Sequence, residues 1–247
     1  MRYLVLSDMH GNRGALAAVL RRVRRKRFDA VLVLGDLVGY GAAPNQVVAT
    51  VRALPGRVVA VRGNHDKVAV GIDSGGSFNQ VALIAAHWTS RRLTRDHARY
   101  VRELPAGPRP VDPGLAICHG SPLDEDKYLF SDQDAAEVFA SWRVPVTFFG
   151  HTHVTSVFSV GDGWVRVRQL AGARGELEVL PGHRYLINPG SIGQPRDGDP
   201  RASFMTYDSD RRLVRWYRVP YPIEEEQRRI RRAELPEILA DRLAVGA

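Results

Sequence analysis

The sequence has one cysteine, three lysines and no long apolar run, and each scarcity excludes a class of protein. Cys118 has no second cysteine to pair with, so the 247-residue chain forms no internal disulfide, and a reducing compartment is expected. We expect Cys118, which falls within a strand pattern, to be a buried structural thiol rather than a redox centre. No stretch approaches the roughly 20 apolar residues that cross a bilayer, and the N-terminus lacks the apolar core of a signal peptide. We therefore expect a cytoplasmic protein with no membrane partner.

The positive charge of the chain comes almost entirely from arginine. The formal net charge is +8, although lysine occurs only at positions 26, 67 and 127. Arg21–Arg27 and Arg228–Arg232 are the two most basic runs. A solvated helix face is the simplest explanation of such a run, and attraction of anionic substrates such as RNA ends is the alternative. Because no motif with interleaved aromatic residues accompanies the charge, we expect no dedicated nucleic-acid-binding role.

The first half of the chain alternates strand and helix patterns. A strand pattern at 2–7, a helix pattern at 13–26 and a strand pattern at 30–34 together predict a parallel β-α-β unit. A helix that opens at Pro44 and a strand at 57–61 continue this order. The alternation is typical of an α/β protein.

The rhythm changes in the middle of the chain. Residues 67–104 show helical periodicity, from which we expect a small helical insertion that caps or flanks the site. The second half favours antiparallel strands, which we expect at 154–160, 164–170, 176–180, 184–188, 203–207 and 213–219. A helical tail at about 222–247 is broken at Pro236. We predict one domain, residues 1–247, built as a four-layer α/β/β/α sandwich of two stacked mixed β-sheets flanked by helices.

Candidate ligand side chains follow five of the predicted strands. Each group comes directly after a β-rich apolar run and stands beside glycine. Side chains at the carboxyl ends of such strands converge on one crevice of an α/β sheet. Five of the eight histidines occupy these positions. The groups are Asp8-Met9-His10-Gly11-Asn12, Gly35-Asp36, Gly63-Asn64-His65-Asp66, Cys118-His119-Gly120 and Gly150-His151-Thr152-His153.

These residue types predict a metal centre. Taken alone, each group has a structural explanation, because an aspartate after glycine is often a turn residue; the joint pattern favours metal binding. In an extended segment Asp8 and His10 would point the same way. Carboxylates and imidazoles without a thiolate cluster suit Mn, Fe, Zn, Ni or Co better than a structural zinc site. Seven ligands predict two ions that share one carboxylate and activate a bridging water as the nucleophile.

In order and spacing, the motifs resemble those of calcineurin-like metallophosphoesterases over about residues 8–153. Asp8–Asn12, Asp36–Gly41 and Asn188–Ser191 resemble the compact bacterial and archaeal phosphodiesterase branch of the YfcE type. This resemblance implies a dinuclear metal-dependent phosphoesterase in which a metal-bridging hydroxide attacks in line. Manganese is the leading expectation for both ions, with iron, nickel, cobalt or zinc as alternatives.

The resemblance also implies a role for each candidate residue. His65 would be catalytic, stabilising charge at the scissile phosphate or protonating the leaving oxygen. Asp36 would bridge the two ions. The first ion would be bound by Asp8, His10, Asp36 and His153, and the second by Asp36, Asn64, His119 and His151.

The segment after Asp36 departs from the protein Ser/Thr phosphatase branch. That branch continues Gly-Asp with x-Val-Asp-Arg-Gly, whereas Leu37–Gly41 lacks the second aspartate and the phosphate-clamping arginine. The departure favours an open, apolar pocket that accepts phosphodiesters. We expect Asn12, Arg13 and Tyr40 to be substrate neighbours.

The predicted function is therefore the hydrolysis of small phosphodiesters, including nucleotide-derived or RNA-end-derived ones. A phosphomonoesterase or a protein Ser/Thr phosphatase is the alternative within the family. A non-catalytic scaffold that keeps the fold is the alternative from another class, although all seven ligand positions and His65 are intact. Asn188–Ser191 is equally compatible with a structural turn and with a place near the site, and the sequence leaves the oligomeric state open.

Overall fold

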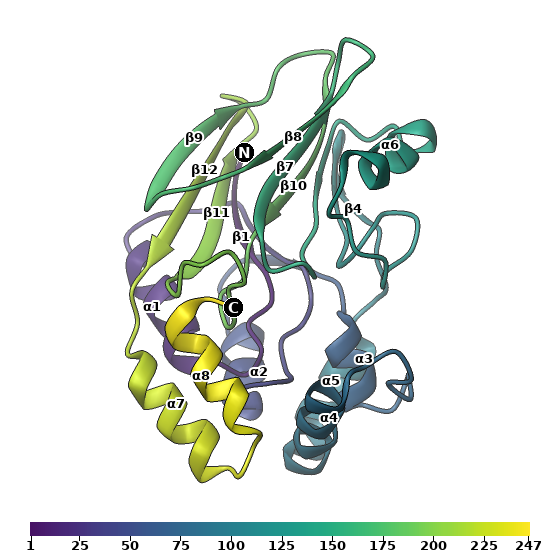
Figure 1. Cartoon of the computed structure of the whole chain (residues 1–247). Helices are drawn as coiled ribbons and strands as arrows, with labels where there is room; N and C mark the ends of the chain where they lie inside the picture. Colours follow the sequence, from purple (N-terminus) through teal and green to yellow (C-terminus); the bar gives the residue numbers. More distant parts are fainter.

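Two six-stranded mixed β-sheets form the centre of the molecule (Figure 1). The computed structural model describes all 247 residues. The first sheet has the strand order β3-β2-β1-β11-β12-β9 and the second the order β4-β5-β6-β10-β7-β8. The strands are β1 (Arg2–Leu6), β2 (Ala30–Val33), β3 (Arg57–Ala60), β4 (Arg109–Asp112), β5 (Leu115–Ile117), β6 (Val146–Phe148), β7 (Thr155–Val160), β8 (Val165–Gln169), β9 (Arg174–Glu178), β10 (Arg184–Pro189), β11 (Ala202–Asp208) and β12 (Leu213–Val219).

Helices cover the outer faces of both sheets. Helices α1 and α2 pack on the first sheet, and α6 packs on the second, so the predicted four-layer α/β sandwich is confirmed. None of the helices has both the length and the apolar character that a membrane crossing would require. The helices are α1 (Arg13–Val23), α2 (Pro44–Arg52), α3 (Asn64–Ala69), α4 (Gln80–Arg92), α5 (Arg95–Glu103), α6 (Asp132–Ser141), α7 (Ile223–Arg232) and α8 (Glu237–Val245).

The side chains of strand β1 contribute to two hydrophobic cores, one on each face of the first sheet. Tyr3 and Val5 point into the core between the sheets, while Leu4 and Leu6 pack against the helical layer, because successive strand side chains face opposite ways. Strands β2 and β3 run parallel to β1. Burial on both faces explains the continuous apolar runs of these strands. The parallel arrangement brings the carboxyl ends of β1, β2 and β3 to one edge of the sheet.

Two groups of helices lie beyond that edge. Helices α3, α4 and α5 form one group, as expected for residues 67–104, and the C-terminal α7 and α8 form the other (Figure 1). Tyr40, from the loop after β2, packs in one apolar cluster with Ala85 of α4 and Leu239 of α8. The helix groups therefore meet around the loop that follows Asp36.

Several element boundaries differ from the expected ones. Helix α1 ends at Val23, so the last residues of the basic run lie outside it. Strand β9 begins at Arg174, two residues before the expected start. Strand β4 was not expected, because it contains Pro110, which cannot donate a ladder hydrogen bond; β4 is an edge strand, where proline is tolerated.

Candidate metal centre

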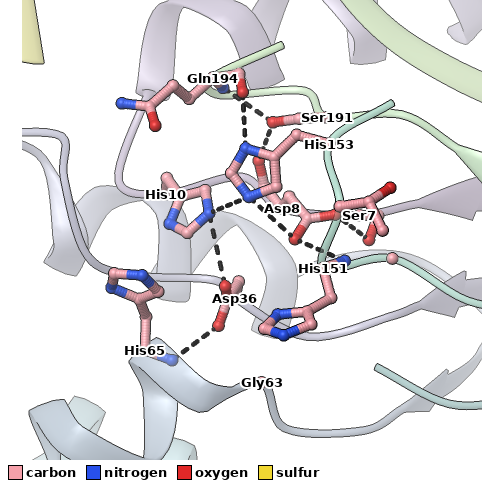
Figure 2. Close-up of polar contacts among 12 residues, drawn as sticks. Ser7, Asp8, His10, Asp36, Gly63, His65, His151, His153, Ser191 and Gln194 are labelled. Carbon is pink, nitrogen blue, oxygen red and sulfur yellow. Dashed lines mark hydrogen bonds and ion pairs between the residues drawn. The ribbon is translucent and has the colours of Figure 1, made fainter. Parts of the chain in front are cut away.

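Loops at the carboxyl ends of five strands bring the predicted ligands together. Six of the seven are buried, and Figure 2 shows the side chains of several pointing toward one another. Two sets of side chains have ligand atoms within 4.8 Å of one another: Asp8, His10, Asp36 and His153, and Asp36, His119 and His151. Asn64 joins the second set, because its Oδ1 lies 3.0 Å from His119 Nε2.

The backbone at these ligands is left-handed rather than extended. Five ligands have positive φ, and Asp8 (52°) and His10 (46°) are two of them. The expectation that an extended segment aligns Asp8 with His10 is therefore wrong. Aspartate and histidine tolerate this region better than most residues, and such conformations cluster at functional sites. The other three are Asp36 (51°), His151 (68°) and His153 (60°).

Asp36 is common to both ligand sets. Its Oδ2 lies 3.4 Å from His10 Nε2 and 3.5 Å from His119 Nε2, and it is buried without a hydrogen-bond partner. Its other oxygen, Oδ1, accepts a hydrogen bond from the backbone N–H of His65 at 2.9 Å. One carboxylate oxygen is therefore oriented by the protein, while the other remains free between the two sets.

Backbone carbonyls orient all four ligand imidazoles. One ring nitrogen of each donates to a carbonyl oxygen, so the other nitrogen presents its lone pair to the centre. The free Nε2 atoms of His10 and His153 lie only 3.0 Å apart, a distance that two lone pairs tolerate when a cation lies between or beside them. The carbonyl contacts are His10 Nδ1 to Val38 (3.1 Å), His119 Nδ1 to Leu34 (2.8 Å), His151 Nε2 to Asp126 (3.0 Å) and His153 Nδ1 to Gln194 (2.6 Å).

The pKa values of the ligand side chains indicate that the cluster favours bound cations. Burial raises the pKa of Asp8 to about 7. Burial opposes ionisation of Asp36 too, but the nearby His119 outweighs it and holds the pKa of Asp36 well below its usual value. Burial likewise lowers the pKa of His119, but the Asp36 carboxylate reverses the effect and raises the pKa to about 10. Burial lowers the pKa of His151 to about 3, which leaves a neutral imidazole. The ionised Asp36 carboxylate, with one unpartnered oxygen, is therefore balanced only by the proton on His119, and a divalent cation could take the place of that proton.

Close packing around Asp36 explains one glycine of the motifs. A Cβ atom at Gly63 would lie 2.1 Å from Asp36 Oδ1 and 2.6 Å from its backbone nitrogen. Only glycine therefore allows the loop after β3 to approach the shared carboxylate. Asp66 links the loops after β2 and β3, because its two carboxylate oxygens accept hydrogen bonds from the N–H groups of Val38 (3.2 Å) and Gly63 (3.0 Å).

His65 differs from the ligand histidines in its surroundings. It lies at the start of α3 and is 4% exposed, but its Nδ1 is buried without a partner and contacts no orienting carbonyl. Its ring packs against Tyr40, with 4.3 Å between centroids, and Phe78, with 4.5 Å. Burial lowers the pKa of His65 to about 4. The ring is thus held beside the ligands by aromatic contacts, and no hydrogen bond fixes its Nδ1.

Aromatic side chains that the sequence argument did not select form the rim of the centre. Tyr128 stacks on His151 with 3.7 Å between ring centroids. A cavity of about 170 Å³ opens between Phe78 and Tyr128 and reaches Asn64 and His151. Nothing in the sequence marks these two aromatics, because each lies in an irregular loop outside the motifs.

Arg196 is a third rim residue that the sequence did not indicate. Its Nη2 donates to Tyr40 Oη and to Gln194 Oε1, each at 3.2 Å. Its backbone N–H donates to the carbonyl of His153 at 3.2 Å. The segment after Asp36 has no arginine, but this distant loop between β10 and β11 supplies one to the same rim.

Comparison with known proteins finds a family model that matches the part of the chain that carries the motifs. Residues 1–155 match the family model described as calcineurin-like phosphoesterase. The chain belongs to the calcineurin-like phosphoesterase family. The matched residues include every predicted ligand and His65.

Similar proteins cover almost all of this phosphoesterase. A metallophosphoesterase structure from Sphaerobacter thermophilus is 39% identical, with a TM-score of 0.86, over 100% of this chain and 99% of that chain. The uncharacterized protein MJ0912 of Methanocaldococcus jannaschii is 34% identical over 98% of this chain and 97% of its own. The phosphodiesterase YfcE of Escherichia coli K12 is 24% identical over 85% of this chain and 89% of its own. The resemblance to the YfcE-type branch is thereby confirmed.

Of the three substrate-side candidates, the phosphoesterase fold brings only Tyr40 against His65. The side chain of Asn12 caps helix α1 by accepting from Ala15 N–H (3.0 Å) and donates to the Gly193 carbonyl (2.9 Å). Arg13 is exposed at the start of α1. The amide of Asn12 is thus engaged in structural contacts and Arg13 faces solvent, and their expected substrate contacts stay predictions.

The Asn188–Ser191 segment supports the ligand loops of the phosphoesterase. Asn188 Nδ2 donates to the Gly150 carbonyl at 2.6 Å, and Ser191 Oγ donates to the Asp8 carbonyl at 2.8 Å. Both side chains are fully buried. The segment is thus the end of β10 and the start of the loop that follows, and it lies beside the site.

Proposed function

We propose that this chain is a dinuclear metal-dependent phosphoesterase that hydrolyses small phosphodiesters. The observation that carries the proposal is the position of Asp36 Oδ2, unpartnered between His10 and His119 and common to two ligand sets. A buried carboxylate shared in this way suits the bridge of a two-ion hydrolytic site. Seven intact ligands and His65 argue against the non-catalytic scaffold.

In this proposal each side chain has a defined task. Asp8, His10, Asp36 and His153 would hold one ion, and Asp36, Asn64, His119 and His151 the other. When bound, two such ions supply Lewis acidity at the phosphate and lower the pKa of a water for in-line attack. Manganese is the leading candidate, because carboxylate and carbonyl oxygens suit it; the imidazole donors keep iron, nickel, cobalt and zinc as alternatives.

His65 would act on the substrate rather than on the ions. Its place beside Asp36, without an orienting carbonyl on its ring, suits a donor to a phosphate oxygen or to the leaving oxygen. The neutral ring can donate one N–H without being an acid at pH 7. The negative charge of a bound phosphate would raise the pKa of His65 and favour its protonated form.

Two observations support diesters over monoesters. Tyr40, Phe78 and Tyr128 line the rim, and a cavity of about 170 Å³ gives space for a second ester substituent. The curated relative YfcE is named a phosphodiesterase.

Chromogenic substrates test the proposal directly. The full chain is reconstituted with Mn²⁺, its metal content is measured, and kcat/KM is compared for bis(p-nitrophenyl) phosphate and p-nitrophenyl phosphate. We expect two ions per chain and a higher kcat/KM for the diester. A preference for the monoester at saturating metal contradicts the diester assignment, and two bound ions without turnover of either ester favours the scaffold.

A further inference from the structure

The basic side chains near the opening of the site differ in whether they form salt bridges with acidic residues. Arg62 pairs with Glu125 at 3.0 Å, and Lys67 pairs with Glu125 at 3.2 Å and with Asp126 at 2.5 Å. Arg196 makes no salt bridge, and its only side-chain partners are the neutral oxygens of two other residues. Arg196 therefore keeps an uncompensated positive charge at the rim.

Arg196 lies beside aromatic residues that pack on each half of the metal centre. It bonds to Tyr40, whose ring packs on His10 of the first ligand set with 4.7 Å between centroids. Across the opening, Tyr128 stacks on His151 of the second set. Burial raises the pKa of Tyr128, and the charge of Arg196 opposes that rise, so the guanidinium is close to this tyrosine as well. An anion held by both ions would face this guanidinium.

The hydrogen-bonding capacity of Arg196 is unfilled. Its Nε is buried without a partner, while Nη2 binds Tyr40 and Gln194. A buried donor without an acceptor is unfavourable, and a planar guanidinium matches two oxygens of a phosphate. Gln194 is 1% exposed and its Nε2 is also unpartnered, which leaves a second donor on the same loop.

We propose that Arg196 binds a non-bridging oxygen of the substrate phosphate and so supplies the cation that Leu37–Gly41 lacks. The inference rests on the proposed phosphoesterase function and adds a substrate-binding residue from outside the motifs. Arginine, rather than lysine, fits this role because its planar fork binds phosphate through two N–H groups.

Binding of inorganic phosphate tests this assignment without turnover. Isothermal titration of phosphate into the Mn²⁺-reconstituted full chain is compared for the wild type, Arg196→Gln and Arg196→Lys. Because a hydrogen bond to a charged group is worth about tenfold to a hundredfold in affinity, we expect Arg196→Gln to weaken phosphate binding by about that factor. Arg196→Lys should restore part of the loss, and KM for the diester should rise more than kcat falls. Arg168→Gln, an exposed arginine of β8 far from the motifs in sequence, is the control for the change in net charge.

Metal content and melting temperature complete the design. Unchanged phosphate affinity in Arg196→Gln with both ions bound overturns the proposal. Loss of ions together with phosphate affinity also overturns it, because Arg196 would then act structurally through His153. If Arg196→Gln does not fold, Arg196→Lys decides: several-fold weaker phosphate binding supports the proposal and unchanged binding refutes it. If the wild type binds phosphate but hydrolyses neither ester, the proposed function fails while this comparison still tests Arg196.

Discussion

Replacing His65 with alanine separates chemistry from assembly. The contact by which His65 orients Asp36 comes from its backbone N–H, which donates to Asp36 Oδ1 at 2.9 Å and remains in the variant. The imidazole itself has an unpartnered Nδ1 and touches no orienting carbonyl. We therefore expect His65→Ala to bind two ions with wild-type stoichiometry and to lose activity.

The expected falls in kcat and in the free energy of unfolding follow from the role and the surroundings of the ring. A positioned acid–base or charge-stabilising group is worth roughly 10²–10⁴ in rate, so kcat should fall by that factor. The ring packs on two aromatic side chains, Tyr40 and Phe78, and each such contact contributes about 0.5–1.5 kcal/mol. Their loss should lower the free energy of unfolding by about 1–3 kcal/mol, which a domain of ordinary stability tolerates.

The assay combines elemental analysis, thermal melting and steady-state kinetics on two diesters. If His65 protonates the leaving oxygen, a nitrophenyl diester should lose less activity than an alkyl diester, because nitrophenolate needs little protonation. His87→Ala, an exposed histidine of α4, is the matched control. Loss of an ion from His65→Ala would place His65 among the ligands and refute the reasoning. An unchanged kcat would refute its catalytic role.

Three further predictions concern the ligands. Asp36→Ala should lose both metal occupancy and activity, because one carboxylate belongs to both ligand sets, and elemental analysis showing two retained ions would contradict it. Gly63→Ala should weaken metal binding in a titration, since its Cβ would meet Asp36 Oδ1 at 2.1 Å, whereas Gly76→Ala, whose Cβ meets only Ser74 Oγ at 3.7 Å, should not. Burial lowers the pKa of His119 but Asp36 raises it to about 10, so binding of the second ion must displace a proton. Metal affinity should therefore rise as pH increases toward 10, by up to tenfold per pH unit, and a pH-independent affinity would exclude this coupling.

The ligand groups were predictable because they are local in sequence. A buried strand, a glycine and a ligand recur five times, and parallel strands bring their carboxyl ends to one edge. The continuous apolar run of β1 and the helical periodicity in residues 67–104 likewise depend on near neighbours. The capping pair Ser131 and Asp134, which starts α6, is a further local signal that the structure contains.

The rim was not predictable for the opposite reason. Arg196, Phe78 and Tyr128 lie in irregular loops, whose positions depend on contacts with residues far away in sequence. The backbone of Arg196 is fixed by the carbonyl of His153, 43 positions earlier, and its side chain by Tyr40. Inspection of Leu37–Gly41 alone cannot detect Arg196, because tertiary structure brings this arginine to the site from another segment.

The left-handed ligands explain why the metal centre is part of the fold rather than an addition to it. A left-handed conformation is unfavourable for a non-glycine residue, and five ligands adopt it. The backbone offsets part of this cost by extending the sheet's hydrogen bonding into the loops: Asp8 N–H donates to the Gly35 carbonyl at 3.2 Å, and His10 N–H to the Asp36 carbonyl at 2.9 Å. The loops that carry the ligands thus continue the hydrogen bonding of the strands. The same β-structure that forms the core holds the strained ligand backbone in place.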